Sequence, residues 1–485
     1  MHTPSSSLSP SPSPSSSSSS ASIATLSPPP VNLSPSPQPT AEPLLLRSFS
    51  KALAKRRDIQ LTRATPVPVP GLVDFSSNDY LGLARSPDVA KEFHSRLTAA
   101  AAGDGGDSSL VGATGSRLLS GNSTQALELE AYLADYHSAP SALLFNSGWD
   151  ANLSLLSTLP QQNGAIIYDA AVHASIHDGI KLGRAKHAVS FRHNDIAHLR
   201  EVLDSLLLPT AGNAAPQCET AVVAVSSFYS MDGDVAPLRE ITSLLADPRY
   251  GHPRRAVLIV DEAHSTATMG PHGRGLVAAL GLEHKVFARL HTFGKGLGAH
   301  GAVVLGPQML RDYLVNYARP LIYSTMMPPH SLVAIRAAYE VLYTQAGVLQ
   351  ARLRTLVKVF RDVMGVLPAP ARLLSSENMI QGIVLPGNAN VVALATLIQS
   401  RGFDVKPIRS PTVPLGTERV RVCLHAHNTA EEVVAFAAAA RGALAELARR
   451  SSSSGSGNQH KQQQQQQQQH ALSSSTDGGA LPARL

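Results

Sequence analysis

Short apolar runs alternate with longer amphipathic stretches along the middle of the chain, from Leu44 to Arg450. The apolar runs are short, lie near turn residues and predict buried strands. They are SALLF (141–145), GAIIY (164–168), TAVVAVSS (220–227), RAVLIVD (255–261) and GAVVLG (301–306). Strands that are apolar on both faces and separated by helices indicate a mainly parallel sheet covered on both sides. The predicted fold class is therefore α/β.

The amphipathic stretches predict helices. In residues 124–137 the apolar positions recur every three or four residues, which is helical spacing. From Ser331 onward long helices dominate, one of them over residues 390–402. The last helix is predicted to begin at NTAEE, where Thr429 and Glu432 have the spacing of a capping box.

Changes in composition and pattern predict the domain boundaries. Residues 1–43 are rich in Ser and Pro and residues 451–485 in Ser and Gln, compositions that cannot bury enough apolar surface to fold. Between these tails we predict an N-terminal arm (44–105), a large α/β domain (106–330) and a smaller C-terminal α+β domain (331–450).

Bulk properties narrow the class of protein. Of the 485 residues, 43% are hydrophobic. The net charge is +6 and the charged fraction is only 16%, so nucleic acid is not an expected partner. No apolar run approaches the roughly 20 residues that a bilayer-spanning helix needs, so no membrane span is expected. Cys218 and Cys423 alone provide neither a disulfide framework nor a metal-binding quartet. A reducing compartment is expected.

The C-terminal tripeptide is a candidate targeting signal. Ala483-Arg484-Leu485 follows the small-basic-Leu pattern of the Ser-Lys-Leu peroxisomal address. The sequence therefore predicts a peroxisomal location. The alternative is a chance match and a cytoplasmic protein.

The first candidate catalytic residue is Lys295, in the stretch HTFGKGLGAHGAVVLG (291–306). It lies among glycines, shortly before an apolar run. A desolvated lysine loses its proton more easily and becomes nucleophilic toward carbonyls. The motif VDEAH places Asp261 and His264 at the end of a predicted strand, the edge where open α/β sheets bind ligands.

Other interpretations of these residues remain. A nucleotide hydrolase would need the phosphate loop Gly-x-x-x-x-Gly-Lys-Ser/Thr, which is absent around Lys295, and no second histidine follows His264 at metal-binding spacing. Asp261 and His264 could also form a structural pair, and Lys295 could be a surface lysine on a turn. Together, however, a lysine and a strand-end aspartate meet the needs of pyridoxal phosphate (PLP): the amine forms a Schiff base and the carboxylate keeps the ring nitrogen protonated.

Eight ordered blocks resemble the α-oxoamine synthases, which are PLP enzymes of fold type I, over residues 44–445. The blocks are FSSNDYLGL (75–83), FNSGWDAN (145–152), VHASIHDG (172–179), YSMDGDVAPL (229–238), DEAHSTATMGPHGRG (261–275), TFGKGLG (292–298), IYSTMMPP (322–329) and IRSPTVPLGTERVRV (408–422).

The resemblance implies roles for residues around the cofactor. Lys295 would hold the cofactor and remove the substrate's α-proton, Asp261 would pair with the ring nitrogen, and His264 and Ser230 would contact the phenolic oxygen. His173 would stack on the ring and contact the substrate.

The resemblance also places the cofactor phosphate and the substrates. Gly148 and Trp149 would open a helix whose amides face the phosphate, and Thr292 would add a hydroxyl. Arg421 would bind the carboxylate of the amino-acid substrate. Thr412 and Arg63 would contact the acyl thioester. Asn78 would help to shape the site.

The last two blocks favour the family branch that condenses L-alanine with pimeloyl-CoA, or a pimeloyl carrier protein, in biotin synthesis. Members of the family are homodimers with shared active sites, which we expect here. The alternatives are a relative that uses another amino acid or acyl-CoA, such as a glycine C-acetyltransferase-like or secondary-metabolite enzyme, and an inactive partner subunit.

Overall fold

The computed structural model describes residues 43–58, 61–65, 67–102, 111–209, 215–250 and 255–450. It contains two compact units, one ending at Thr65 and the other beginning at Pro66. The first unit contains helix α1 (Leu44–Asp58), which has no buried side chain and carries three basic residues in its last turn. Basic side chains there interact favourably with the negative end of the helix dipole.

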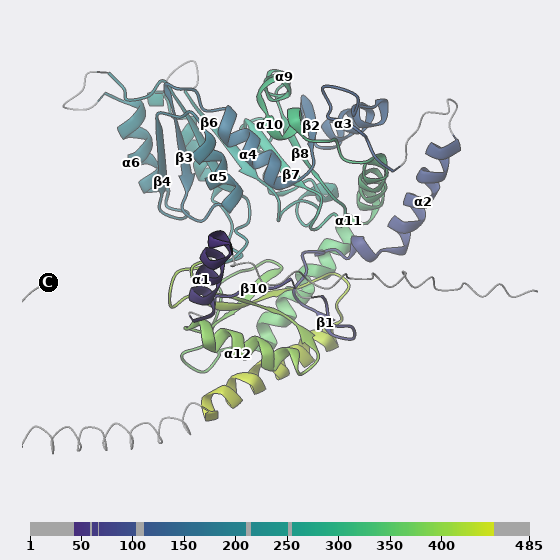
Figure 1. The fold of residues 1–485 in the computed structure, drawn as a ribbon, viewed down its shortest axis with the longest axis vertical. Helices are drawn as coiled ribbons and strands as arrows, with labels where there is room; N and C mark the ends of the chain where they lie inside the picture. The colour runs from purple at the N-terminus through teal and green to yellow at the C-terminus, as the bar shows by residue number, and fades with distance from the viewer. Residues whose placement is uncertain are drawn as a thin grey trace, which may run out of the picture. The chain divides into compact units, whose positions relative to one another are not determined.

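The second unit contains a seven-stranded sheet of order β2-β8-β7-β6-β5-β3-β4 (Figure 1). Its strands are β2 (Ser141–Phe145), β3 (Gly164–Asp169), β4 (His187–Phe191), β5 (Thr220–Ser226), β6 (Ala256–Asp261), β7 (Ala288–Thr292) and β8 (Ala302–Gly306). Every pairing is parallel except those of β8, which is antiparallel to β7 and β2. The α/β class and all five predicted strands are confirmed.

Both faces of this sheet are buried. Along β5, Val222 and Ala224 belong to one apolar cluster, and Val223 and Val225 to the other. Helices α4 (Gly148–Thr158), α5 (Ala174–Leu182), α9 (Gln308–Tyr317) and α10 (Arg319–Tyr323) contribute to the first cluster. Helices α3 (Thr124–Tyr136), α6 (Ile196–Leu207), α7 (Leu238–Leu245), α8 (Leu276–Ala279) and α11 (Pro329–Met364) contribute to the second.

The C-terminal part of the chain builds a second, antiparallel sheet of order β12-β13-β10-β9. Its strands are β9 (Arg372–Leu373), β10 (Ile380–Val384), β12 (Lys406–Ile408) and β13 (Arg419–Cys423), and α12 (Asn388–Gln399) contacts β12 and β13. The predicted capping box is confirmed: the Thr429 N–H donates to Glu432 Oε2 at 3.0 Å, and the Glu432 N–H donates to Thr429 Oγ1 at 3.1 Å. Residues 430–450 are helical.

The segment that precedes the large domain associates with the C-terminal part. Strand β1 (Val73–Asp74) pairs in parallel with β11 (Phe403–Asp404). Helix α2 (Pro87–Ala102) follows and packs against α11. Short 3-10 helices occur at Leu83–Arg85, Pro248–Tyr250 and Pro271–Gly273. The domain boundaries themselves stay a prediction.

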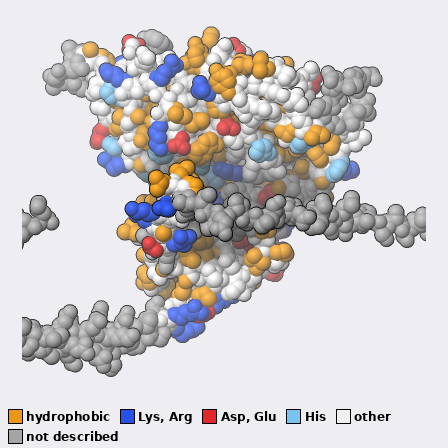
Figure 2. Space-filling model, in the orientation of Figure 1, with side chains coloured by type: hydrophobic (Ala, Val, Ile, Leu, Met, Phe, Trp, Pro, Cys, Tyr) orange, Lys and Arg blue, Asp and Glu red, His pale blue; other side chains and the backbone are white. Residues whose placement is uncertain are grey.

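The surface carries mixed charge. On the face drawn in Figure 2, basic and acidic side chains are interspersed with apolar ones over the large domain. Within the described ranges, no helix has the combined length and apolarity that a bilayer crossing requires. Cys218 and Cys423 are both buried free thiols.

Candidate active site

The carboxyl ends of the parallel strands bring the predicted polar residues into one pocket. Asp261 ends β6, and the segments that follow β3, β5 and β7 supply the others. His173, Ser230, Asp261, His264 and Lys295 all line this pocket. It lies at the sheet edge where the sequence predicted ligand binding.

Lys295 lies in the turn between β7 and β8, with its Nζ 3.0 Å from His264 Nε2. Burial lowers the pKa of its ammonium from 10.5 to about 8; the Asp261 carboxylate partly opposes this shift and Arg421 adds to it. Gly296, which follows Lys295, allows close backbone packing. A Cβ on Gly296 would lie 2.7 Å from Thr266 O.

The buried Asp261 carboxylate accepts a hydrogen bond at each of its two oxygens. The Ala263 N–H donates to its Oδ1 at 2.9 Å, and the Asn152 side-chain amide donates to its Oδ2 at 2.8 Å. Asn152 lies on α4, one turn after the helix begins. These N–H donors fix the orientation of the carboxylate.

His264 connects Lys295 to a second buried group. Its Nδ1 lies 2.7 Å from the hydroxyl of Tyr80, which donates to Asn78 Oδ1 at 2.9 Å. Burial holds the pKa of His264 well below its usual range, and the charges of Lys295 and Arg421 add to this effect. The imidazole is therefore neutral at physiological pH, and it can accept or donate a hydrogen bond toward the pocket.

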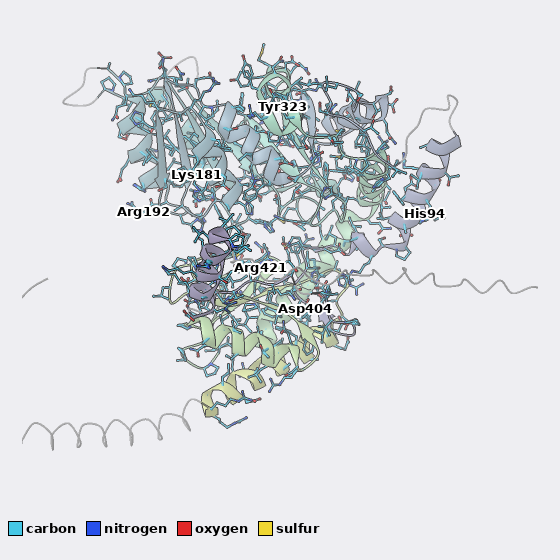
Figure 3. The ribbon with its side chains drawn as sticks, viewed as in Figure 1. His94, Lys181, Arg192, Tyr323, Asp404 and Arg421 are labelled. Carbon is cyan, nitrogen blue, oxygen red and sulfur yellow. The ribbon has the colours of Figure 1, made fainter. Side chains whose placement is uncertain are left out.

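Arg421 reaches the site from β13 of the smaller sheet (Figure 3). Its Nε donates to the Ser230 carbonyl at 2.9 Å, and both Nη atoms lie 3.2 Å from Asn78 Oδ1. One oxygen thus bridges the fork of the guanidinium, the position that a carboxylate oxygen takes in an arginine–carboxylate pair. A third contact, of 3.2 Å, joins Nη2 to the Tyr80 hydroxyl.

The start of α4 is the candidate phosphate site. Gly148 is the first residue of the helix, and a Cβ on it would lie 3.3 Å from the Cβ and Oγ1 of Thr292. Open backbone N–H groups at a helix N-terminus attract anions. Trp149 is 43% exposed, and its ring meets the His173 ring edge-on at 5.9 Å. Trp149 is therefore not part of the buried core.

The substrate roles of Thr412 and Arg63 stay predictions. Thr412 is exposed, and its backbone N–H donates to Arg409 O at 2.9 Å. Arg63 belongs to the unit that ends at Thr65, so its role stays a prediction. Conversely, three residues not singled out from the sequence, Tyr80, Asn152 and Ser175, contact predicted site residues. Asn152 comes four residues after Gly148 and so lies on the same side of α4. This spacing could have identified Asn152 as a site residue from the sequence.

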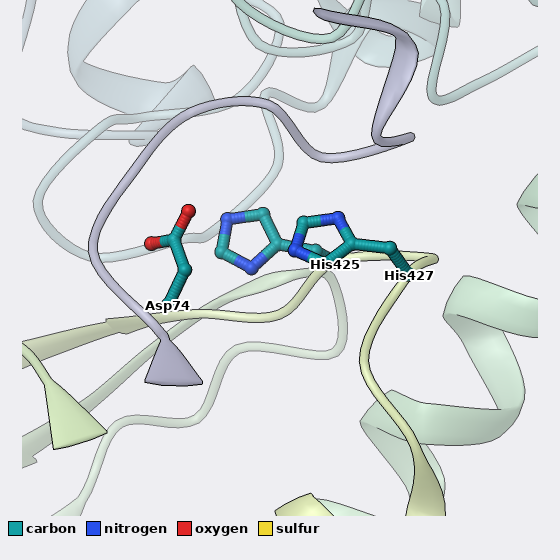
Figure 4. A group of neighbouring side chains, drawn as sticks. All are labelled: Asp74, His425 and His427. Atoms are coloured by element: carbon teal, nitrogen blue, oxygen red, sulfur yellow. The ribbon is translucent and has the colours of Figure 1, made fainter. Parts of the chain in front are cut away.

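A second polar cluster joins Asp74, His425 and His427, whose potential ligand atoms lie within 4.8 Å of one another (Figure 4). Arg85 already donates to Asp74 Oδ2 at 3.0 Å, and His425 Nε2 lies 3.1 Å from Ser77 Oγ. The imidazoles stack with centroids 4.8 Å apart and planes at 19°. Imidazole lone pairs lie in the ring plane, so stacked rings do not aim at one ion. We assign the cluster a structural role.

Known proteins resemble this chain over most of its length. The family model for aminotransferase class I and II matches residues 70–439. An 8-amino-7-oxononanoate synthase of Emericella nidulans is 43% identical over 397 residues, which is 81% of this chain and 94% of that protein. The aminoacyl transferase sphA of Aspergillus fumigatus is 36% identical over 81% of this chain and 85% of its own length.

Solved structures support the same assignment. A serine palmitoyltransferase from S. paucimobilis, solved with a bound PLP–myriocin aldimine, superposes with a TM-score of 0.69 at 28% identity. The match covers 82% of this chain and 99% of that one. With its sheet, its strand-end pocket and these relatives, the chain belongs to the aminotransferase class I and II family and, within it, to the PLP-dependent α-oxoamine synthases.

Proposed function

We propose that the chain condenses L-alanine with pimeloyl-CoA, or with a pimeloyl carrier protein, to give 8-amino-7-oxononanoate, the free thiol and CO₂ in biotin synthesis. The observation that carries the proposal is the 43% identity to the Emericella nidulans 8-amino-7-oxononanoate synthase over 94% of that protein. The coarser activity, that of a PLP-dependent acyltransferase, follows from the family itself.

The pocket fits pyridoxal phosphate. Lys295 offers a partly desolvated amine to the aldehyde, Asp261 a carboxylate to the ring nitrogen, and the start of α4 its N–H groups to the phosphate. The absence of a Cβ at Gly148 leaves room beside Thr292. When bound, the cofactor supplies a ring that accepts electrons from a carbanion at the substrate's α-carbon.

Lys295 is suited to move the α-proton. Lowering its pKa from 10.5 to about 8 raises the fraction of neutral amine at neutral pH by about two to three orders of magnitude. His264 holds Nζ at 3.0 Å, which orients the lone pair. Nζ can then accept the α-proton of alanine and return a proton after CO₂ leaves.

Arg421 is suited to bind the alanine carboxylate. Asn78 Oδ1 occupies its fork through two contacts of 3.2 Å, long for charge-assisted bonds. A carboxylate can replace this neutral oxygen with a stronger, charged acceptor. The Ser230 carbonyl, held at 2.9 Å by Nε, keeps the guanidinium in place.

A second candidate is supported by other relatives. The similarity to the aminoacyl transferase sphA and to serine palmitoyltransferase favours an α-oxoamine synthase that takes another amino acid or a longer acyl chain. Lys295, Asp261 and His264 would act in the same way. An inactive partner subunit is the weaker alternative, because the lysine and its partners are all present.

A substrate matrix tests the proposal. The PLP-loaded protein is mixed with alanine, glycine or serine, each with pimeloyl-CoA or palmitoyl-CoA, and thiol release and product mass are measured. We expect alanine with pimeloyl-CoA to have the highest kcat/KM. A tenfold preference for serine or for palmitoyl-CoA would favour the second candidate. Failure of the protein to bind PLP would favour the inactive subunit. Lys295→Ala controls for uncatalysed thiol release.

We also propose a homodimer with shared sites, supported by the resemblance of residues 322–329 to a family block. Asn146 fixes this segment by donating to Ser324 Oγ at 3.2 Å and to Thr325 O at 2.8 Å. Sedimentation measures the mass of the assembly and so tests whether the protein is a dimer. Two variants inactivated at different residues should regain activity on mixing if sites are shared, and unchanged inactivity would refute sharing.

A peroxisomal location is proposed from the terminal tripeptide, which lies outside the described residues. A fluorescently tagged chain ending at Pro482 should become cytosolic, whereas the full chain with the tag at its N-terminus should be punctate. An unchanged location on truncation would contradict the proposal.

A further inference from the structure

Two buried polar residues link the carboxylate at the end of β6 to the histidine that caps α5. Asn152 is 2% exposed and Ser175 0% exposed, so water does not compete for their hydrogen bonds. The Asn152 amide contacts Asp261 Oδ2 at 2.8 Å and Ser175 Oγ at 3.0 Å, and Ser175 Oγ lies 2.8 Å from His173 Nδ1.

The direction of each bond follows from chemistry. A carboxylate oxygen only accepts, so the Asn152 atom facing Asp261 is the amide nitrogen. The same nitrogen only donates, so Ser175 Oγ accepts from it. The hydroxyl proton of Ser175 is then free to point at His173 Nδ1.

A second donor also converges on that nitrogen. His173 is the N-cap of α5, and the backbone N–H of Ser175 points at Nδ1 at 3.3 Å. A nitrogen that accepts from two donors carries no proton of its own. Protonating it would also place a cation at the positive end of the helix dipole. The imidazole proton is therefore left on Nε2.

We propose that Asn152 and Ser175 are positioning residues that hold the single imidazole proton of His173 on Nε2 while they fix the Asp261 carboxylate. His173 lines the pocket, so it offers a hydrogen-bond donor there and no basic nitrogen. Of His173 and Lys295, only Lys295 can then accept a proton in the site. The inference rests on the family's cofactor chemistry and not on the identity of the amino acid or acyl chain.

The first test needs neither cofactor nor substrate. In cofactor-free protein with ¹⁵N-labelled histidine, long-range ¹H–¹⁵N spectra distinguish the two neutral tautomers and the cation. Among the 19 histidines, the His173 signal is the one that disappears in His173→Asn. We expect the form protonated on Nε2 alone. A proton on Nδ1 in the unmodified protein would overturn the inference.

The second test removes the hydroxyl donor. Ser175→Ala should change the His173 spectrum toward a mixture of tautomers and weaken PLP binding to the cofactor-free protein by about 2- to 10-fold, the effect of one hydrogen bond. Ser175→Thr should restore both properties. The matched control is Ser154→Ala, because Ser154 is also buried, on α4, and its hydroxyl has no hydrogen-bond partner within the structure described.

The outcomes separate a positioning role from simple packing. If Ser175→Ala and Ser154→Ala weaken PLP binding equally and the His173 spectrum is unchanged, the inference is wrong. Asn152→Leu, which removes the donors to both Asp261 and Ser175, should lower PLP affinity more than Ser175→Ala does. An equal or smaller effect would contradict the link to Asp261. None of these results depends on which substrates the enzyme uses.

Discussion

Replacing Lys295 with methionine should stabilise the cofactor-free protein at neutral pH, because burial opposes the charge of the ammonium. The gap between a pKa of 10.5 in the unfolded chain and about 8 in the folded one, at about 1.36 kcal/mol per pH unit, corresponds to at most about 3 kcal/mol. The side chain is partly exposed, so solvent screening makes this an upper value.

The sign and the pH window follow from proton linkage. Between pH 8 and 10.5 the unfolded chain binds a proton that the folded chain has released, so wild-type stability rises with pH there. Below pH 8 the full penalty applies, and above 10.5 it vanishes. Methionine also loses the bond to His264, which costs about 1 kcal/mol at every pH. The variant should therefore be more stable below pH 8 and slightly less stable above 10.5.

Urea unfolding of both proteins below pH 8 and above 10.5 measures this difference. Lys285→Met, at an exposed lysine ten positions earlier, controls for the loss of one positive charge. A stability difference between Lys295→Met and wild type that stays constant across this window would refute the reasoning.

Three further substitutions test two residues of the site and the buried Glu262, which follows Asp261 in the chain. Arg421→Lys keeps the positive charge but loses the forked pair of N–H donors. The KM for the amino acid should therefore rise roughly 10- to 150-fold, the range for hydrogen bonds to a charged group. An unchanged KM would exclude Arg421 from carboxylate binding. Tyr80→Phe leaves His264 Nδ1 without its 2.7 Å partner and should lower the free energy of unfolding by about 1–3 kcal/mol; equal stability in urea would show that the contact contributes nothing. Burial raises the pKa of Glu262 from 4.5 to about 7, so wild type should lose up to about 3 kcal/mol of stability as pH rises through that window. Glu262→Gln should lack that slope, and parallel stability curves for the two proteins would contradict the pKa.

The sequence predicted the parts of the site that depend on strand ends. Asp261 follows an uninterrupted apolar strand, so it was expected at the edge of the sheet where ligands bind, and Lys295 was singled out by its glycine-rich surroundings next to another apolar run. Their roles as cofactor ligands came from paired motifs whose residues lie close together in the chain. That is why these positions could be predicted without knowing how distant segments pack.

Residues whose partners are remote could not be predicted. Strand β7 was missed because it contains Arg289 and His291, which are buried only because distant groups satisfy them. An Arg289 Nη atom donates to His137 O at 3.0 Å, and His291 Nδ1 lies 2.9 Å from Thr266 Oγ1. Strand β4 was missed for another reason: it lies at the sheet edge, and its residues alternate between partly buried and exposed positions.

The pairing of β1 with the distant strand β11 has a consequence for biosynthesis. The Val73 N–H donates to Gly402 O, and the carbonyls of Phe75 and Tyr80 accept from the N–H groups of Cys423 and Ala426, each at 2.8 Å. In each of these bonds, the residue in the segment 73–80 is synthesised more than three hundred residues before its partner. The loop that carries Tyr80 therefore cannot form these three bonds until residues 402–426 have been synthesised, so this part of the fold should be completed late.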